Sequence, residues 1–428
     1  MSFSSRISLG RAHLLASTVA REARRAGLPF DELHHVGGLR RFAPELEDVA
    51  LLVIAPESKH AQVLKGFTTL SIVTTTSATS SRARSLTTER GALTLHLATP
   101  ESAGSALAWH TGADDHLALL RAKAVDHGLA FDSPALLRGR TVVECRTEAH
   151  FYELLGLPHI PPELRHGTDE IDAALRERLP RLVYESDIRG DLHVHSSWSD
   201  GRDSLEDMVG AAQQLGYEYV AITDHSERAA ASRTLAVADV ARQKAEIESL
   251  RLRVVGIQIL HGVEVDIMPD GSLDFDDSLL QDLDIVLASL HDEAGQDGAS
   301  LTGRYLRAMH HPLVNVITHP ANRSPARSSG YDLDFARLFD AAVSTGTAME
   351  IDGAPGHLDM DGSVARLAAL AGVTLTVSSD AHRAEWLGRQ MGFGTGTARR
   401  GWVEPRHVLN ARGVDEVRAF VARKRARM

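Results

Sequence analysis

Histidine, aspartate and glutamate recur directly after short apolar segments in the second half of the chain. In Asp191-Leu-His-Val-His195 two imidazoles stand two residues apart, so on a strand both point to one face and can reach one ion. Imidazole nitrogens and carboxylate oxygens together suit Zn²⁺, Mn²⁺ or Fe²⁺. The candidate metal ligands are His193, His195, Asp200, His225, Glu264, His291, His319, Asp380 and His382.

A single histidine or aspartate after a strand is more often a hydrogen-bonded structural residue or a helix cap than a metal ligand. The recurrence of such residues at equivalent places, one strand end after another, favours ligation for the set as a whole. Cys145 is the only cysteine, which excludes an internal disulfide and a thiolate zinc cluster. The sequence therefore predicts a metal centre built from imidazole and carboxylate.

The elements that position these residues alternate between strand and helix. Amphipathic helical patterns separate most of the apolar segments, and this alternation predicts a parallel sheet that closes, or nearly closes, into a barrel. In such barrels the functional residues lie at the carboxyl ends of the strands, where the candidate ligands fall. The expected strands are residues 191–195, 219–223, 257–265, 285–290, 314–318, 347–351 and 374–378.

The first part of the chain has a different pattern. Helices are expected at 10–26 and 116–128, with short strands near 49–54, 71–75 and 92–98, and residues 76–84 are expected to be an exposed loop. We therefore expect a smaller α+β domain over 1–165, a linker over 166–187 and an α/β barrel domain over 188–428.

Composition limits the classes of function. The chain has 43% apolar and 24% charged residues, with neither an apolar run long enough to span a membrane nor an export signal, so we expect a cytoplasmic protein that does not enter a membrane. The net charge of −11 argues against broad adhesion to nucleic acid, although a metal cluster could still attract an anionic substrate. The oligomeric state stays open.

Several phrases of the second half resemble the PHP (polymerase and histidinol phosphatase) family of metal-dependent phosphoesterases. More closely, they resemble the C-terminal PHP module of bacterial family X DNA polymerases. The fold that this resemblance implies is a distorted (β/α)7 barrel. The phrases are Asp187-Ile-Arg-Gly-Asp-Leu-His-Val-His195, Trp198-Ser-Asp-Gly201, Thr223-Asp-His-Ser226, Gly262-Val-Glu-Val-Asp266, Ser379-Asp-Ala-His382 and Ala398-Arg-Arg-Gly-Trp402.

The resemblance also implies three divalent metal ions, Mn²⁺ or Zn²⁺ with Fe²⁺ possible. His193, His195, Glu264 and Asp380 would hold the first ion and carry the catalysis. Glu264 would bridge to a second ion with His291 and His319. A third ion would take Asp200, His225 and His382. Arg323 could clamp phosphate oxygens, and Arg383 is a weaker candidate for the same role.

The first part resembles, in altered form, the palm and thumb of those polymerases, a nucleotidyltransferase-like domain. Gly37-Gly-Leu-Arg-Arg41 and Asp48-Val-Ala50 look like the nucleotide-binding motif and the paired aspartates, but Ala50 and Thr94 stand where the family has carboxylates. The family's helix-hairpin-helix region is not recognised ahead of this segment. Two-metal nucleotidyl transfer needs several carboxylates, so we predict that polymerase activity is lost.

The function expected from this resemblance is hydrolysis of DNA phosphoesters, as a 3′-to-5′ exonuclease or a 3′-end processing enzyme in repair. One alternative is a small-molecule phosphatase of the histidinol-phosphatase type, which is favoured by two departures from the family pattern. Asp352 stands where the family usually has Asn, and His357 where it usually has Arg. Another alternative is a non-catalytic DNA-binding or scaffold protein.

Overall fold

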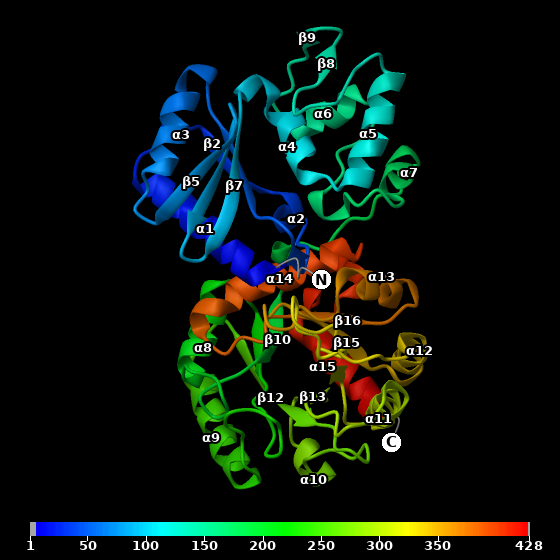
Figure 1. Ribbon diagram of the computed structural model, residues 1–428. Helices are drawn as coiled ribbons and strands as arrows, with labels where there is room; N and C mark the ends of the chain where they lie inside the picture. The colour runs from blue at the N-terminus through cyan, green and yellow to red at the C-terminus, as the bar shows by residue number, and fades with distance from the viewer. Residues whose placement is uncertain (1–5, 427–428) are drawn as a thin grey trace. The chain divides into compact units, whose positions relative to one another are not determined.

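The computed structural model describes residues 6–426 and divides into two compact units, Met1–Leu179 and Pro180–Met428 (Figure 1). The division falls within the segment expected to be a linker. Each unit has its own sheet, and each is described by itself below.

Within the described part of Pro180–Met428, seven strands form one parallel sheet in chain order. A parallel bridge between Val194 and Ala381 joins the first strand to the segment after the last. The backbone N–H of His195 donates to the carbonyl of Ala381 at 3.0 Å. The nearly closed barrel predicted from the alternation is therefore confirmed. Its strands are β10 (Gly190–Val194), β11 (Tyr219–Ile222), β12 (Gln258–Asp266), β13 (Ile285–Ser289), β14 (Val316–Ile317), β15 (Ala348–Asp352) and β16 (Leu375–Ser378).

Helices follow the strands (Figure 1), and those before α15 pack apolar side chains against the outward side chains of the strands. Several begin at a side chain that caps the first turn: the Ser204 hydroxyl accepts from the Asp207 N–H, and Asp334 and Asp361 act in the same way. The helices are α8 (Leu205–Gln214), α9 (Val237–Arg253), α10 (Asp277–Leu280), α11 (Gly298–His310), α12 (Phe335–Thr345), α13 (Gly362–Leu370), α14 (Leu387–Arg400) and α15 (Val414–Arg425).

The inside of the barrel changes character along its strands. Near the strand starts, Leu260 and Ile285 pack with Phe420 and Val421 of α15 in one apolar cluster. Four residues after Leu260, and therefore on the same face of β12, stands the buried Glu264. Helix α15 thus fills the amino end of the barrel, and the buried polar groups gather at the carboxyl end.

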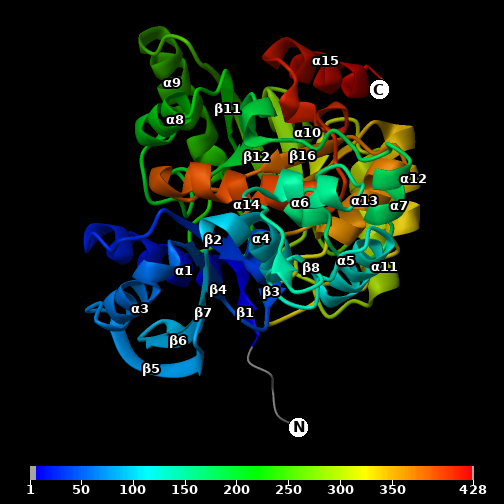
Figure 2. The same cartoon turned by 90° about the horizontal axis from the view of Figure 1, so that it is seen from above.

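The unit Met1–Leu179 contains a five-stranded sheet in the order β2-β4-β7-β6-β5 within its described residues, with α1 and α3 beside it (Figure 2). Strands β4 and β7 are parallel, and the other neighbours are antiparallel. The elements are β1 (Ile7–Ser8), α1 (Leu9–Arg25), β2 (Glu32–Val36), α2 (Gly37–Arg40), β3 (Glu45–Leu46), β4 (Ala50–Ile54), α3 (His60–Thr68), β5 (Val73–Ser80), β6 (Ala83–Thr88), β7 (Gly91–Ala98), α4 (Ala103–Thr111), α5 (Asp114–Asp126), β8 (Leu137–Arg138), β9 (Thr141–Val142), α6 (Glu148–Leu154) and α7 (Glu170–Leu175).

The prediction of a loop at residues 76–84 is wrong. This stretch forms most of β5 and the start of β6, which pair as an antiparallel hairpin at the edge of the sheet. Its many Ser and Thr residues suggested a loop, but β-branched Thr also fits an exposed strand, and the pairing with β6 decides between the two.

Candidate metal centre

The candidate ligands lie where the sequence placed them, at the carboxyl ends of the barrel strands. His193 is in β10 and Glu264 is in β12. Each of the others follows a strand by a few residues or lies in the loop after it, because the strand brings its last inward residue to the mouth of the barrel and the chain then turns away. His225 follows β11, His291 follows β13, His319 follows β14, Asp380 and His382 follow β16, and Asp200 lies in the loop after β10.

Glu264 is the centre of this arrangement. Its Oε2 lies 2.8 Å from His225 Nδ1, 3.4 Å from His193 Nε2 and 3.7 Å from His195 Nε2. Its Oε1 lies 2.8 Å from His319 Nε2 and 3.7 Å from His291 Nε2. One carboxylate thus faces imidazoles that come from several strands or the loops that follow them. This arrangement suits cation binding, since a carboxylate can bridge ions that neighbouring imidazoles complete.

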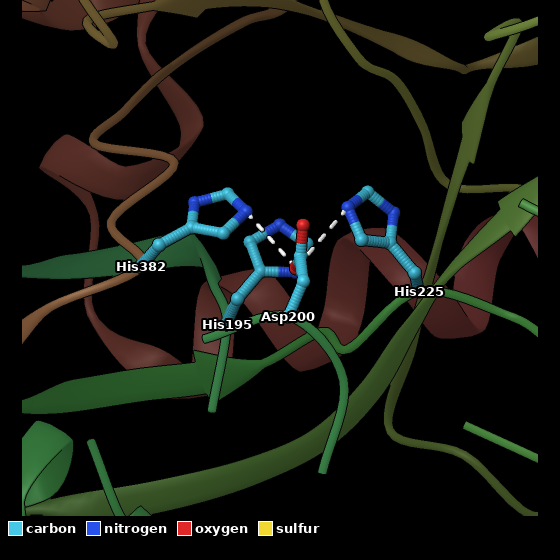
Figure 3. A group of neighbouring side chains, drawn as sticks. All are labelled: His195, Asp200, His225 and His382. Carbon is cyan, nitrogen blue, oxygen red and sulfur yellow. Dashed lines mark ion pairs between the residues drawn. The ribbon is translucent and has the colours of Figure 1, made fainter. Parts of the chain in front are cut away.

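Three groups of candidate ligands each place one donor atom per residue within 4.8 Å of the others. The first group is His195, Asp200, His225 and His382, and Figure 3 shows the His382 and His225 rings directed at the Asp200 carboxylate. The second is His193, His195 and Asp380, and the third is His225, Glu264 and His291.

The grouping differs in detail from the expected division. His195 also lies with the residues expected at the third ion, and His225 also lies with Glu264 and His291. His319 reaches the cluster through Glu264. The candidate ligands therefore form one continuous cluster with shared members.

Burial separates an inner part of the cluster from a rim. His193, His195 and Glu264 have no exposed surface, whereas the side chains of Asp200, His291 and His382 are 18%, 16% and 26% exposed. A substrate can therefore approach from the rim, past Asp200, His291 and His382.

The charges of the inner residues depend on one another. Burial alone would raise the pKa of Glu264, but the imidazoles of His225, His193 and His291 hold it well below its usual range. Burial would lower the pKa of His193, but the carboxylates of Glu350, Glu264 and Asp380 raise it well above its usual value. Metal ligation requires neutral imidazole and ionised carboxylate, so a divalent cation could replace the protons that balance this charge.

The donor atoms also fit metal ions on geometric grounds. His193 Nε2 and His195 Nε2 face each other at 3.0 Å. Glu264 Oε2 and Asp200 Oδ1 are buried and accept no hydrogen bond from the described residues. Buried polar atoms are normally satisfied, so atoms left over at one convergent point indicate a ligand.

Further residues, to which the sequence assigned no role, hold the ligands in place. Glu350 accepts from His193 Nδ1 at 2.8 Å and from the His319 backbone N–H at 2.9 Å. Asp266 accepts from His291 Nδ1 at 2.6 Å. Such partners fix the ring orientation and the tautomer of a ligand. The spacing of two residues between Asp266 and the ligand Glu264 on one strand is a signal that could have found Asp266, whereas no such signal marks Glu350.

Asp224 fixes the loop that carries Asp200. Its carboxylate accepts from the backbone N–H of Ser196 at 2.8 Å and of Ser199 at 3.1 Å. Gln243 of α9 donates a further hydrogen bond to it at 2.6 Å. The position of Asp200 therefore depends on a buried carboxylate that precedes the ligand His225 in the sequence.

The two candidate arginines have partners of their own. Arg323 Nη1 donates to Asp361 at 2.9 Å, and its Nε has no hydrogen-bond partner among the described residues. Arg383 packs over Trp386, 5.2 Å from the ring centre, and its side chain is 41% exposed.

In the other unit, the two residues expected at the positions of polymerase carboxylates are neighbours. Ala50 of β4 pairs with Thr94 of β7. Arg40, from the motif expected to bind nucleotide, makes two hydrogen bonds to Glu148, at 3.0 and 2.5 Å. Arg41 donates to the carbonyl of Thr111. The two sites that could supply carboxylates beside Asp48 are therefore neutral, and both arginines of the motif contact protein groups.

None of the helices in the described part of the chain is long and apolar enough to cross a membrane.

Comparison with known proteins agrees with the division of the chain into two units. Residues 191–319 match the family model of the PHP domain, and residues 106–166 match that of the DNA polymerase beta thumb. The chain is 37% identical over 329 residues to the DNA polymerase/3'-5' exonuclease PolX of Bacillus subtilis, which covers 76% of this chain and 57% of the relative. The chain thus spans little more than half the length of that relative.

Other relatives are covered over most of their own length. A probable phosphatase of Syntrophotalea carbinolica is 30% identical over 208 residues, 46% of this chain and 80% of the relative. A probable phosphatase of Shewanella oneidensis is 32% identical over 210 residues and is covered to 78%. Among solved structures, the polymerase beta of Leishmania infantum in a ternary complex matches 37% of this chain and 76% of that chain, at 17% identity and a TM-score of 0.33.

Proposed function

Because this chain belongs to the PHP domain family, and is therefore a metal-dependent phosphoesterase, we propose that it acts on DNA as a 3′-to-5′ exonuclease or 3′-end processing enzyme in repair. The observation that carries the proposal is the buried cluster around Glu264 at the mouth of the barrel, in a chain whose other unit is of the polymerase type. The name of the Bacillus subtilis relative, which includes a 3'-5' exonuclease, supports DNA as the substrate.

The metal ligands we propose are the nine candidates, with Glu264 shared between positions. Divalent ions held there would lower the pKa of an attacking water and neutralise charge on the phosphoryl oxygens. Residues of the chain itself orient the imidazoles for metal binding. Glu350 keeps the proton of His193 on Nδ1, which leaves Nε2 directed into the cluster, and Asp266 does the same for His291.

We also propose that Arg323 contacts the phosphate. Its side chain is 11% exposed, and its Nε has no hydrogen-bond partner among the described residues, so one edge of the guanidinium is available for an oxyanion. Asp361 would hold the other edge in place. Arg383 has weaker support, because its guanidinium packs on Trp386.

We infer that the polymerase-type unit no longer polymerises and serves to position DNA. Asp48 alone offers too few oxygen ligands for two-metal nucleotidyl transfer, since Ala50 and Thr94 supply none. Templated primer extension with Mg²⁺ or Mn²⁺ that Asp48→Ala abolishes would contradict this inference.

The nuclease proposal is tested with Mn²⁺-loaded protein and a 3′-labelled DNA hairpin, on single-stranded, gapped and 3′-phosphorylated ends. The proposal expects shortening or 3′-phosphate release that is absent in His193→Ala. If every DNA substrate stays intact while wild-type protein binds metal, the proposal is wrong.

A small-molecule phosphatase is the second candidate. It is supported by the relatives named probable phosphatase, most of whose length is covered by less than half of this chain. Rapid phosphate release from histidinol phosphate, at a rate that DNA does not change, would favour it. A scaffold role would show as stabilisation by metal without hydrolysis of any phosphoester.

A further inference from the structure

Asp352 and His357 lie beside the cluster but outside the set of nine candidate ligands. Asp352 is the last residue of β15, two residues after Glu350, so both carboxylates are on the inner face of the barrel. One donor atom each of Asp352, His357 and Asp380 lies within 4.8 Å of the other two. His357 is held in position by its neighbour His319, whose ring stacks on it at 4.9 Å with 18° between the planes.

The Asp352 carboxylate has no exposed surface, and only one of its two oxygens accepts a hydrogen bond. Its Oδ1 accepts from the Ala354 N–H at 2.6 Å, whereas Oδ2 has no hydrogen-bond partner among residues 6–426. His357 Nδ1 is also buried without a partner in that range. Buried polar atoms are normally paired, so both atoms are open to a ligand.

The neighbouring carboxylates have imidazole partners, whereas the only hydrogen-bond partner of the Asp352 side chain among the described residues is the Ala354 backbone N–H. Glu350 is paired with His193 Nδ1 at 2.8 Å, and Asp380 lies 3.0 Å from His195 Nε2. No ion pair of Asp352 is found among the described residues. Close like charges in a buried site are unfavourable, so an ionised Asp352 needs a positive charge next to it.

We propose that Asp352, His357 and Asp380 form an additional divalent cation site, which shares Asp380 with the group of His193 and His195. This proposal rests on the proposed metal-dependent function. Two carboxylates and one imidazole suit Mn²⁺, and the coordination positions that these three residues leave open can accept a phosphoryl oxygen of the substrate.

The alternative is a proton on Asp352, and metal stoichiometry separates the two. Equilibrium dialysis against Mn²⁺, read by elemental analysis, compares wild type with Asp352→Asn and His357→Gln. We expect each variant to hold one Mn²⁺ per chain fewer than wild type. Asp359→Asn is the matched control, because Asp359 is an equally buried carboxylate that accepts from the Ala321 N–H and is expected to keep the full metal content.

Thermal unfolding provides a second readout. Without metal, we expect Asp352→Asn to have a higher melting temperature than wild type, because the variant lacks the unpaired buried carboxylate. We expect added Mn²⁺ to raise the melting temperature of the variant less than that of wild type. If both variants keep the wild-type metal content, the site is refuted and Asp352 carries a proton. If the wild-type protein binds no Mn²⁺ at all, both the additional site and the proposed metal-dependent function are refuted. The failure of the site alone is therefore distinguishable from the failure of the function.

Discussion

His193 Nδ1 donates a hydrogen bond of 2.8 Å to Glu350, which leaves Nε2 of the same ring 3.4 Å from the carboxylate of Glu264. His193 and Glu350 are 157 positions apart in the sequence. The hydrogen bond selects one tautomer, and only that tautomer directs a lone pair into the cluster. Glu350 is therefore a positioning residue for His193.

Glu350→Ala is expected to weaken Mn²⁺ binding about 10–100-fold, because His193 loses the partner that fixes its tautomer. Glu350→Gln keeps an acceptor and should lose less. Competition with a chelator of known affinity measures both. Glu185→Ala is the control, since Glu185 is an exposed carboxylate of the same unit outside the cluster. If the Glu350→Ala variant binds Mn²⁺ as tightly as wild type, the positioning role of Glu350 is contradicted.

Gly201→Ala is expected to reduce phosphoesterase activity about 100-fold, because displacements near 1 Å in an active site have effects of that size. A Cβ at Gly201 would lie 2.5 Å from the Ser196 carbonyl oxygen, so the loop that carries Asp200 must shift. Gly210→Ala is the matched control, since a Cβ there meets no atom within 4 Å. Turnover assays on the preferred phosphoester compare the two, and equal activities would show that the loop tolerates the added carbon.

Removal of metal is expected to destabilise the barrel unit and leave the unit Met1–Leu179 unchanged. Ligand present at about 100 times its Kd stabilises a fold by about 2.7 kcal/mol. Calorimetry of the full chain should therefore show one unfolding transition whose melting temperature falls in EDTA and is restored by excess Mn²⁺. Equal shifts of all transitions, or none, would argue against a metal site confined to the barrel.

Glu148→Gln is expected to destabilise the unit Met1–Leu179 by about 3–5 kcal/mol, because it leaves the fully buried Arg165 without its carboxylate. Burial would raise the pKa of Glu148, but Arg165 and Arg40 hold it well below its usual range. A depressed carboxyl pKa stabilises the fold above the unfolded pKa of about 4.3, and this contribution falls away as the pH decreases below that value.

Calorimetry between pH 3 and pH 7 tests this prediction. The difference in stability between wild type and Glu148→Gln should be largest near neutrality and shrink in acid. Glu153→Gln, on the exposed face of the same helix α6, should differ little from wild type at any pH. A constant difference across the range would mean that the charge of Glu148 does not contribute.

The sequence predicted the barrel and the location of the candidate ligands because both follow local patterns. The alternation of strands and helices predicted the parallel sheet, and every candidate ligand lies in the last residues of a strand or in the segment that follows it. The shared membership of His195 and His225 could not be predicted, because it depends on how neighbouring strand ends converge. The role of Glu350 stayed hidden for the same reason, since its partner is on a strand far away in the sequence.

The pairing of Arg40 with Glu148 bears on the loss of polymerase activity that we infer. Carboxylates introduced at Ala50 and Thr94 would add acidic groups but would not release Arg40, which Glu148 holds with two hydrogen bonds. Freeing Arg40 by removing Glu148 would in turn leave the buried Arg165 without this carboxylate partner. If polymerase activity has been lost, its recovery would therefore have to pass through a less stable protein, so folding stability would oppose the reversal.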